Sequence, residues 1–206
     1  MAARYDDRTW SHLLTAATAG DLPTLTELLP KGDPSTQHNR LLRVALSYAH
    51  EECVRLLLPL SNLSDEVEYE QWIIHCIEKG NLSLVRLLAD QAPFPLLWGG
   101  LFLRAVCDEK ADIVRYIIPL AWDKIQADER YSYKALAIAA LQNNAEIFNE
   151  VLAFSDPERT WRELQAQGRG AEECPLLVEH LERVRQKQAL TQAVDPVQKS
   201  LSVRKI

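Results

Sequence analysis

The sequence predicts an all-α fold: an α-solenoid of about five stacked helix pairs, closed by a C-terminal helical cap. Three observations predict this fold class. Five segments of the chain align with one another without gaps. Each segment carries apolar residues at helical spacing in two clusters. Glycine occurs only 7 times in 206 residues, whereas an all-β sandwich needs frequent turn glycines.

The aligned segments start 29, 31, 29 and 34 residues apart. In each of them the third residue is large and apolar, the sixth is small, and the fifteenth and eighteenth are apolar again. The segments are 11–29, 40–58, 71–89, 100–118 and 134–152.

These offsets predict two short helices in every segment. Positions 3, 6 and 7 lie on one face of a first helix, and positions 15, 18 and 19 lie on one face of a second. In the turn between them, Gly20, Gly80 and Asn143 suit a left-handed residue at a helix C-terminus. Asp21 and Asn81 can then cap the second helix. Because one pair cannot bury its apolar face alone, the pairs must stack.

After the fifth segment the repeat fades. Asp156 and Pro157 form a helix start, and a second helix is expected from about Pro175 to Ala193, ending at Asp195. We therefore expect a solenoid over 1–154, a helical cap over 155–194 packed on it, and a flexible basic tail over 195–206.

The pattern resembles the ankyrin repeat, whose units read T-P-L-H-x-A-A-x-x-G-H and continue with V-x-x-L-L. The first segment reads SHLLTAATAGD at 11–21, and the third keeps Gly80-Asn81, Val85 and Leu88. The resemblance covers about residues 9–153. No segment has the T-P-L-H tetrapeptide, and most connections are shorter than in the family. We therefore expect the finger hairpins of the family to be shortened or absent.

Charge and composition narrow the function classes. The net charge of −6 argues against a binder of nucleic acid, and residues 1–182 alone carry −11 because the C-terminal stretch is basic. No membrane span and no secretion signal is expected, and the four separated cysteines favour a reducing, cytoplasmic setting.

The resemblance implies a non-catalytic protein–protein interaction scaffold. By analogy the protein would be a bacterial effector or regulator, and a secreted effector would act in the host cytosol.

Proteins of the ankyrin type bind through loop tips and the exposed side of each first helix. In this chain the register places tyrosines, tryptophans and acidic residues there, which predicts a contact surface for a partner protein with a basic patch. Trp98 and Tyr133 could instead pack between neighbouring pairs. The predicted partner-binding residues are Trp10, Tyr48, Tyr69, Glu70, Glu78, Lys79, Trp98, Asp108, Glu109, Tyr131, Tyr133 and Gln142.

Several alternatives stay open. The acidic run 65–70 can be a solvated loop, an acidic lip for a basic partner, or a pair of catalytic carboxylates. A small enzyme or enzyme subunit with a Cys/His-containing pocket is the rival function, although Cys76 and the adjacent His75 should point in different directions. The histidines lack metal-ligand spacing, so no metal or cofactor is expected. A monomer is favoured over self-assembly through the terminal helices.

Overall fold

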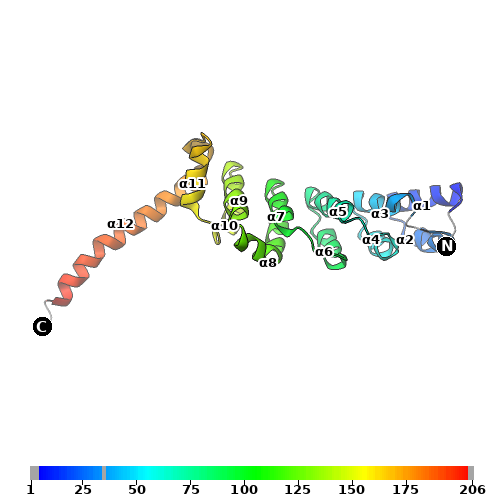
Figure 1. Ribbon diagram of the computed structural model, residues 1–206, viewed down its shortest axis with the longest axis horizontal. Coiled ribbons are helices and arrows are strands. Elements are labelled where there is room, and N and C mark those ends of the chain that lie inside the picture. Colours follow the sequence, from blue (N-terminus) through cyan, green and yellow to red (C-terminus); the bar gives the residue numbers. More distant parts are fainter. Residues whose placement is uncertain (1–4, 34–35, 204–206) are drawn as a thin grey trace. The chain divides into compact units, whose positions relative to one another are not determined.

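The computed structural model describes the backbone of residues 5–33 and 36–203 and divides the chain into two compact bodies. The N-terminal body is Met1–Ile117 and the C-terminal body is Ile118–Ile206. Within the described ranges the chain forms twelve α-helices, three short 3₁₀ turns and no strand, so the predicted all-α class is confirmed (Figure 1). The elements are α1 (Asp7–Ala19), α2 (Leu22–Leu28), η1 (Leu29–Lys31), α3 (Thr36–Ser47), α4 (Glu51–Leu57), η2 (Leu58–Leu60), α5 (Glu66–Glu78), α6 (Leu82–Gln91), α7 (Trp98–Cys107), α8 (Ala111–Ala127), α9 (Arg130–Leu141), α10 (Ala145–Leu152), α11 (Pro157–Ala166), η3 (Ala171–Glu173) and α12 (Pro175–Val203).

Each of the five aligned segments folds as two helices, from α1 and α2 in the first to α9 and α10 in the fifth. The apolar positions that predicted these helices are buried. At the third position these residues are Leu13, Leu42, Ile73, Phe102 and Leu136. At the sixth position they are Ala16, Ala45, Cys76, Ala105 and Ala139. The small sixth residue lets neighbouring helices approach closely, which is why the repeat tolerates only Ala or Cys there.

Every first helix of the five pairs ends in the same turn. One residue adopts a left-handed backbone, with φ between 54° and 72° at Gly20, Ala49, Gly80, Glu109 and Asn143. The next N–H donates to the carbonyl of the small sixth residue, as from Asn81 to Cys76 at 2.9 Å. This is a Schellman turn, which satisfies the carbonyls left open at a helix end.

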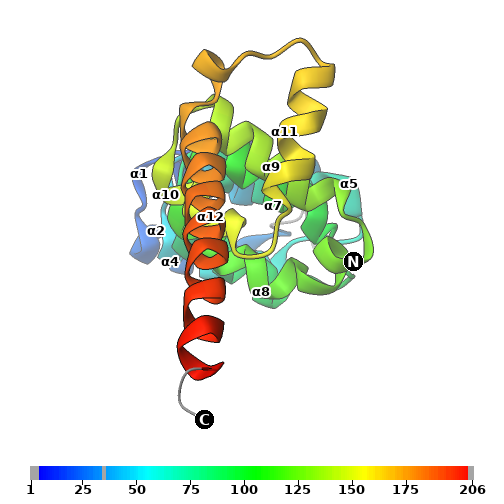
Figure 2. The same cartoon turned by 90° about the vertical axis from the view of Figure 1, so that its left-hand side faces the viewer.

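The same turn occurs a sixth time, between α11 and α12. Gly168 has a φ of 79°, and the N–H of Arg169 donates to the carbonyl of Leu164 at 3.0 Å. The helix α11 begins where the sequence predicted, because the Asp156 side chain accepts from the N–H of Arg159. The expected cap is thus one more helix pair, whose two helices are joined by the segment that holds η3 (Figure 2).

Two predicted boundaries differ from the structure. The last helix was expected to end at Asp195, but α12 continues to Val203, and residues 204–206 lie outside the described residues. Asp195 and Pro196 therefore lie inside α12 and do not end it. The compact bodies divide after Ile117 and not at residue 154, because α9 packs against α11 and α12 as well as against α10.

The N-terminal body positions the candidate site. Its first helices α1, α3, α5 and α7 each contact the next, and its second helices α2, α4 and α6 do the same (Figure 1). The second residue of each segment faces the preceding pair, so Leu41, Trp72 and Leu101 are buried. The equivalent His12 is exposed, since no described helix pair precedes α1.

Candidate functional site

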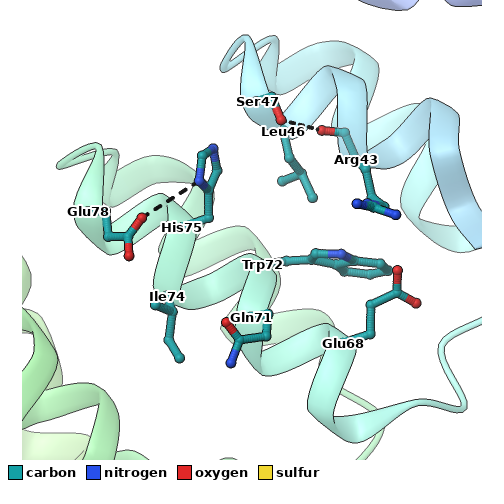
Figure 3. A pocket seen from close by; sticks show the side chains of 9 residues that line it. All are labelled: Arg43, Leu46, Ser47, Glu68, Gln71, Trp72, Ile74, His75 and Glu78. Carbon is teal, nitrogen blue, oxygen red and sulfur yellow. Dashed lines mark hydrogen bonds and ion pairs between the residues drawn. The ribbon is translucent and has the colours of Figure 1, made fainter.

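An open groove of about 430 Å³ lies between the first helices α3 and α5 of the N-terminal body (Figure 3). It follows from the helix register. Positions 4 and 8 of each segment point away from the core, and here three of these four residues, Arg43, Ser47 and Glu78, are polar. The groove is lined by Arg43, Leu46, Ser47, Glu68, Gln71, Trp72, Ile74, His75 and Glu78.

Trp72 is the largest side chain of the groove, and it is only 7% exposed. Its ring lies 5.4 Å from that of Tyr69, tilted by 47°, and it reaches toward α3 beside the Arg43 guanidinium (Figure 3). The indole Nε1 is buried and has no hydrogen-bond partner. An indole N–H is a hydrogen-bond donor, and a buried one normally has an acceptor. The indole of Trp72 is therefore an exception that calls for an explanation.

His75 carries a second buried atom without a partner, Nε2, and lines the same groove. Its other nitrogen, Nδ1, faces the Glu78 carboxylate at 3.9 Å. A nearby carboxylate favours the tautomer with the proton on Nδ1, which leaves Nε2 as an acceptor. The groove therefore contains one hydrogen-bond donor and one hydrogen-bond acceptor without partners, on side chains one helical turn apart on α5.

Glu78 and Asp108, both predicted to contact a partner, are joined by an arginine. Arg104 on α7 donates to Glu78 at 2.6 Å and to Asp108 at 2.7 Å. Hydrogen bonding to Asp108 raises the pKa of Arg104, which stays charged. The Glu78–Arg104 pair ties α5 to α7, whereas Asp108 caps the same helix that carries Arg104. A partner would have to compete with Arg104 for both carboxylates. Trp72 and His75, which the predicted set omitted, have no such competitor.

The acidic run 65–70 begins α5 and is not the solvated loop that was one alternative. Asp65 caps the helix by accepting from the N–H of Glu68, and Glu70 accepts from the N–H of Leu97 at 2.9 Å. These two carboxylates have local structural roles. Glu68 is the acidic residue of this run that lines the groove.

One predicted contact residue is wrong. Tyr69 is fully buried, and its hydroxyl donates to the Leu88 carbonyl at 2.7 Å. It lies on the same face of α5 as Ile73 and Cys76, because α5 begins one turn before the aligned segment does. Burial also raises the pKa of Tyr69.

The other predicted residues of the N-terminal body do not gather at one place. Tyr48 is 58% exposed and stacks on His50, and Trp10 is half-buried against Tyr5. Trp98 is half-buried at the start of α7. Two further predicted residues, both at turns and both exposed, are Lys79 and Glu109.

Three predicted residues belong to the C-terminal body. Tyr131, Tyr133 and Gln142 are all half-buried on or next to α9. The guanidinium of Arg159 lies over the Tyr133 ring, 5.6 Å from its centroid, so Tyr133 packs against the following helix α11. This matches the alternative in which Tyr133 packs between neighbouring pairs.

The residues of the rival enzyme hypothesis are separated. Cys76 is buried, and desolvation raises the pKa of its thiol to about 12, so it is protonated at neutral pH. His75 faces the groove and Cys76 does not line it. Among the described residues no cluster of His, Cys, Asp or Glu could hold a metal ion. In the same part of the chain, no helix is long and apolar enough to cross a bilayer.

No protein-family model matches the chain, and no similar curated protein or solved structure was found. The groove must therefore be interpreted from its own residues.

Proposed function

We propose that this protein is a non-catalytic binding module that holds a segment of another protein in the α3–α5 groove. One observation carries the proposal: the buried, unpartnered Nε1 of Trp72 in an open groove. Leaving such a donor unsatisfied costs about 1–3 kcal/mol, a cost that a phenylalanine at this position would not carry. A binding partner that accepts from Nε1 gives a reason for the tryptophan. Tryptophan is also enriched among residues that dominate binding energy.

The partner segment carries basic groups. The N-terminal body contains sixteen acidic and eleven basic residues. The carboxylate of Glu68 lies at the groove, beside the Trp72 ring (Figure 3). An acidic field of this kind steers a basic partner and raises its association rate.

We also infer that the helix pairs are divergent ankyrin-like units. The regular pairing of helices, the small sixth residue and the left-handed turn after each first helix support this assignment. A cytoplasmic or host-cytosolic setting and an effector role remain predictions by analogy.

A bulky side chain in the groove tests the proposal. Ser47 is exposed at the groove, and its hydroxyl donates to the Arg43 carbonyl at 2.8 Å. Thr18 is the equivalent residue of α1, also exposed, and donates to the Leu14 carbonyl at 2.8 Å. Ser47→Trp fills the groove and should abolish capture of the partner and its photo-cross-linking to a probe at Gln71. Thr18→Trp should leave both unchanged. Equal capture by the two variants would refute a partner site in this groove.

A further inference from the structure

The two buried atoms of the groove that lack a hydrogen-bond partner determine which chemical groups can bind there. Trp72 Nε1 can only donate a hydrogen bond, and His75 Nε2 accepts one while Nδ1 keeps its proton near Glu78. A Lys or Arg side chain cannot satisfy the indole, because it has no acceptor. A carboxylate could accept from it and pair with Arg43, but it would also meet the carboxylate of Glu68 in the same groove. An uncharged carbonyl accepts from the indole without that repulsion.

A peptide main chain offers the required pair of groups. Residues 72 and 75 are three apart on α5, about 4.5 Å along the helix axis at 1.5 Å per residue. An extended chain advances about 3.3 Å per residue and presents carbonyl and N–H groups along its length. Such a chain laid along α5 therefore presents a carbonyl and an N–H to two side chains that leave the helix one turn apart.

We propose that the groove binds an extended, basic peptide segment by its main chain: Trp72 donates to a carbonyl of the segment, His75 accepts from one of its N–H groups, and Glu68 pairs with a Lys or Arg side chain of the segment. This inference rests on the proposed function and names the chemistry of the partner.

Access to the indole requires one side chain to move. The Arg43 guanidinium lies beside the Trp72 ring, where it covers that edge of the groove (Figure 3). Arg43 is exposed, and within the described residues its guanidinium makes no hydrogen bond or ion pair. A long, solvated side chain of this kind can swing into water at little cost. The His75 side chain is 35% exposed but its Nε2 is buried, so the ring must rotate for Nε2 to accept from the segment.

The test starts from a random-sequence peptide library selected on the full-length chain. We expect the selected peptides to be rich in Lys and Arg. Trp72→Phe removes the N–H and also shortens the ring, so it should weaken peptide binding about tenfold. The smaller ring leaves a cavity at this buried site, so the midpoint of urea unfolding should fall as well. Binding is therefore measured under conditions in which both chains are folded, and an affinity equal to that of the wild type would contradict a hydrogen bond from the indole.

Backbone contact is tested by N-methylating the best peptide one residue at a time. One methylated position should lose about tenfold in affinity for the wild-type chain and much less for His75→Phe, as in a double-mutant cycle. Glu68→Gln should weaken binding of basic peptides. Glu66→Gln, on the exposed first turn of the same helix, should not.

The outcomes separate this inference from the proposed function. If Ser47→Trp abolishes peptide binding while Trp72→Phe and every N-methylation leave it unchanged, the groove is a binding site but does not recognise the peptide by its main chain. If Ser47→Trp has no effect either, both proposals fail. A library that yields no peptide dependent on Trp72 also overturns the main-chain proposal.

Discussion

Two aromatic residues one turn apart on α5, Tyr69 and Trp72, have opposite hydrogen-bonding states. The Tyr69 hydroxyl is satisfied by the Leu88 carbonyl, whereas the Trp72 indole has no partner. The sequence placed Tyr69 in the contact surface and left Trp72 out. A helix start at Glu66 would have put both on the inner face. The alignment alone did not show that the second residue of each segment packs against the preceding pair.

The hydroxyl of Tyr69 should contribute measurably to stability. Tyr69→Phe leaves the ring in place and removes the donor to Leu88, so the free energy of unfolding should fall by about 1–2 kcal/mol. Urea denaturation measures the change. Tyr48→Phe is the control, because Tyr48 is 58% exposed and its loss of a hydroxyl should change little. Equal effects of the two substitutions would contradict a structural role for the Tyr69 hydroxyl.

The cysteines should differ in reactivity. Desolvation raises the pKa of Cys53, Cys76 and Cys174, all buried, while Cys107 is exposed. Since the thiolate is the reactive form, a thiol reagent at pH 8 should label Cys107 rapidly and the other three only on unfolding. Mass spectrometry of the labelled native chain measures this. Rapid labelling of Cys76 would reopen the enzyme hypothesis.

Among the elements, the repeated turn is the feature that the sequence predicted only in part. Glycine and asparagine identified three of the turns. Ala49 and Glu109 also adopt the left-handed conformation, although alanine and glutamate do not favour it. The surrounding helix pair imposes it there, at a cost of about 1–2 kcal/mol for a residue with a Cβ. The helix break at Gly168 was expected, but not that it repeats the turn of the five segments, because it follows Asn143 after only 25 residues and the apolar pattern around it is weak.

Introducing glycine at one of these turns should therefore stabilise the fold, and replacing glycine at another should destabilise it. Ala49 is exposed with a φ of 58°, so Ala49→Gly should raise the free energy of unfolding by about 0.5–1 kcal/mol. Gly80 has a φ of 71°, and a Cβ there would only touch the Lys110 side chain at 3.5 Å. Gly80→Ala should thus cost about 1 kcal/mol through backbone strain alone. Thermal unfolding of both variants checks the opposite signs, and a shared sign would refute the argument.

For the whole molecule, the periodicity of apolar residues was enough to predict the class and the helix pairs. It could not predict the division into two bodies, which depends on packing of α9 against both α11 and α12. Nor could it predict the groove, because that depends on which polar atoms find partners across neighbouring helices. The predicted contact residues were consequently spread over both bodies, while Trp72 and His75 lie together in one.

The two bodies should unfold separately. Leu177 is fully buried in α12, so Leu177→Ala should destabilise the C-terminal body by about 2–5 kcal/mol. Hydrogen exchange should then become faster in α9 to α12 and stay unchanged in α1 to α6. Leu42→Ala, in α3, should give the reverse pattern. Faster exchange throughout the chain in either variant would show that the bodies form one cooperative structure.

The backbone-closed turn after every first helix also bears on how the chain folds as it is made. Each turn joins two helices that are adjacent in sequence, and such local topologies fold in microseconds to milliseconds. A ribosome adds about 5–20 residues per second, so a helix pair of 29–34 residues takes on the order of seconds to emerge. Each pair therefore has time to form before the next one leaves the ribosome. The apolar face of a newly formed pair stays exposed only until the next pair packs on it. This limits how much apolar surface is available for aggregation at any moment.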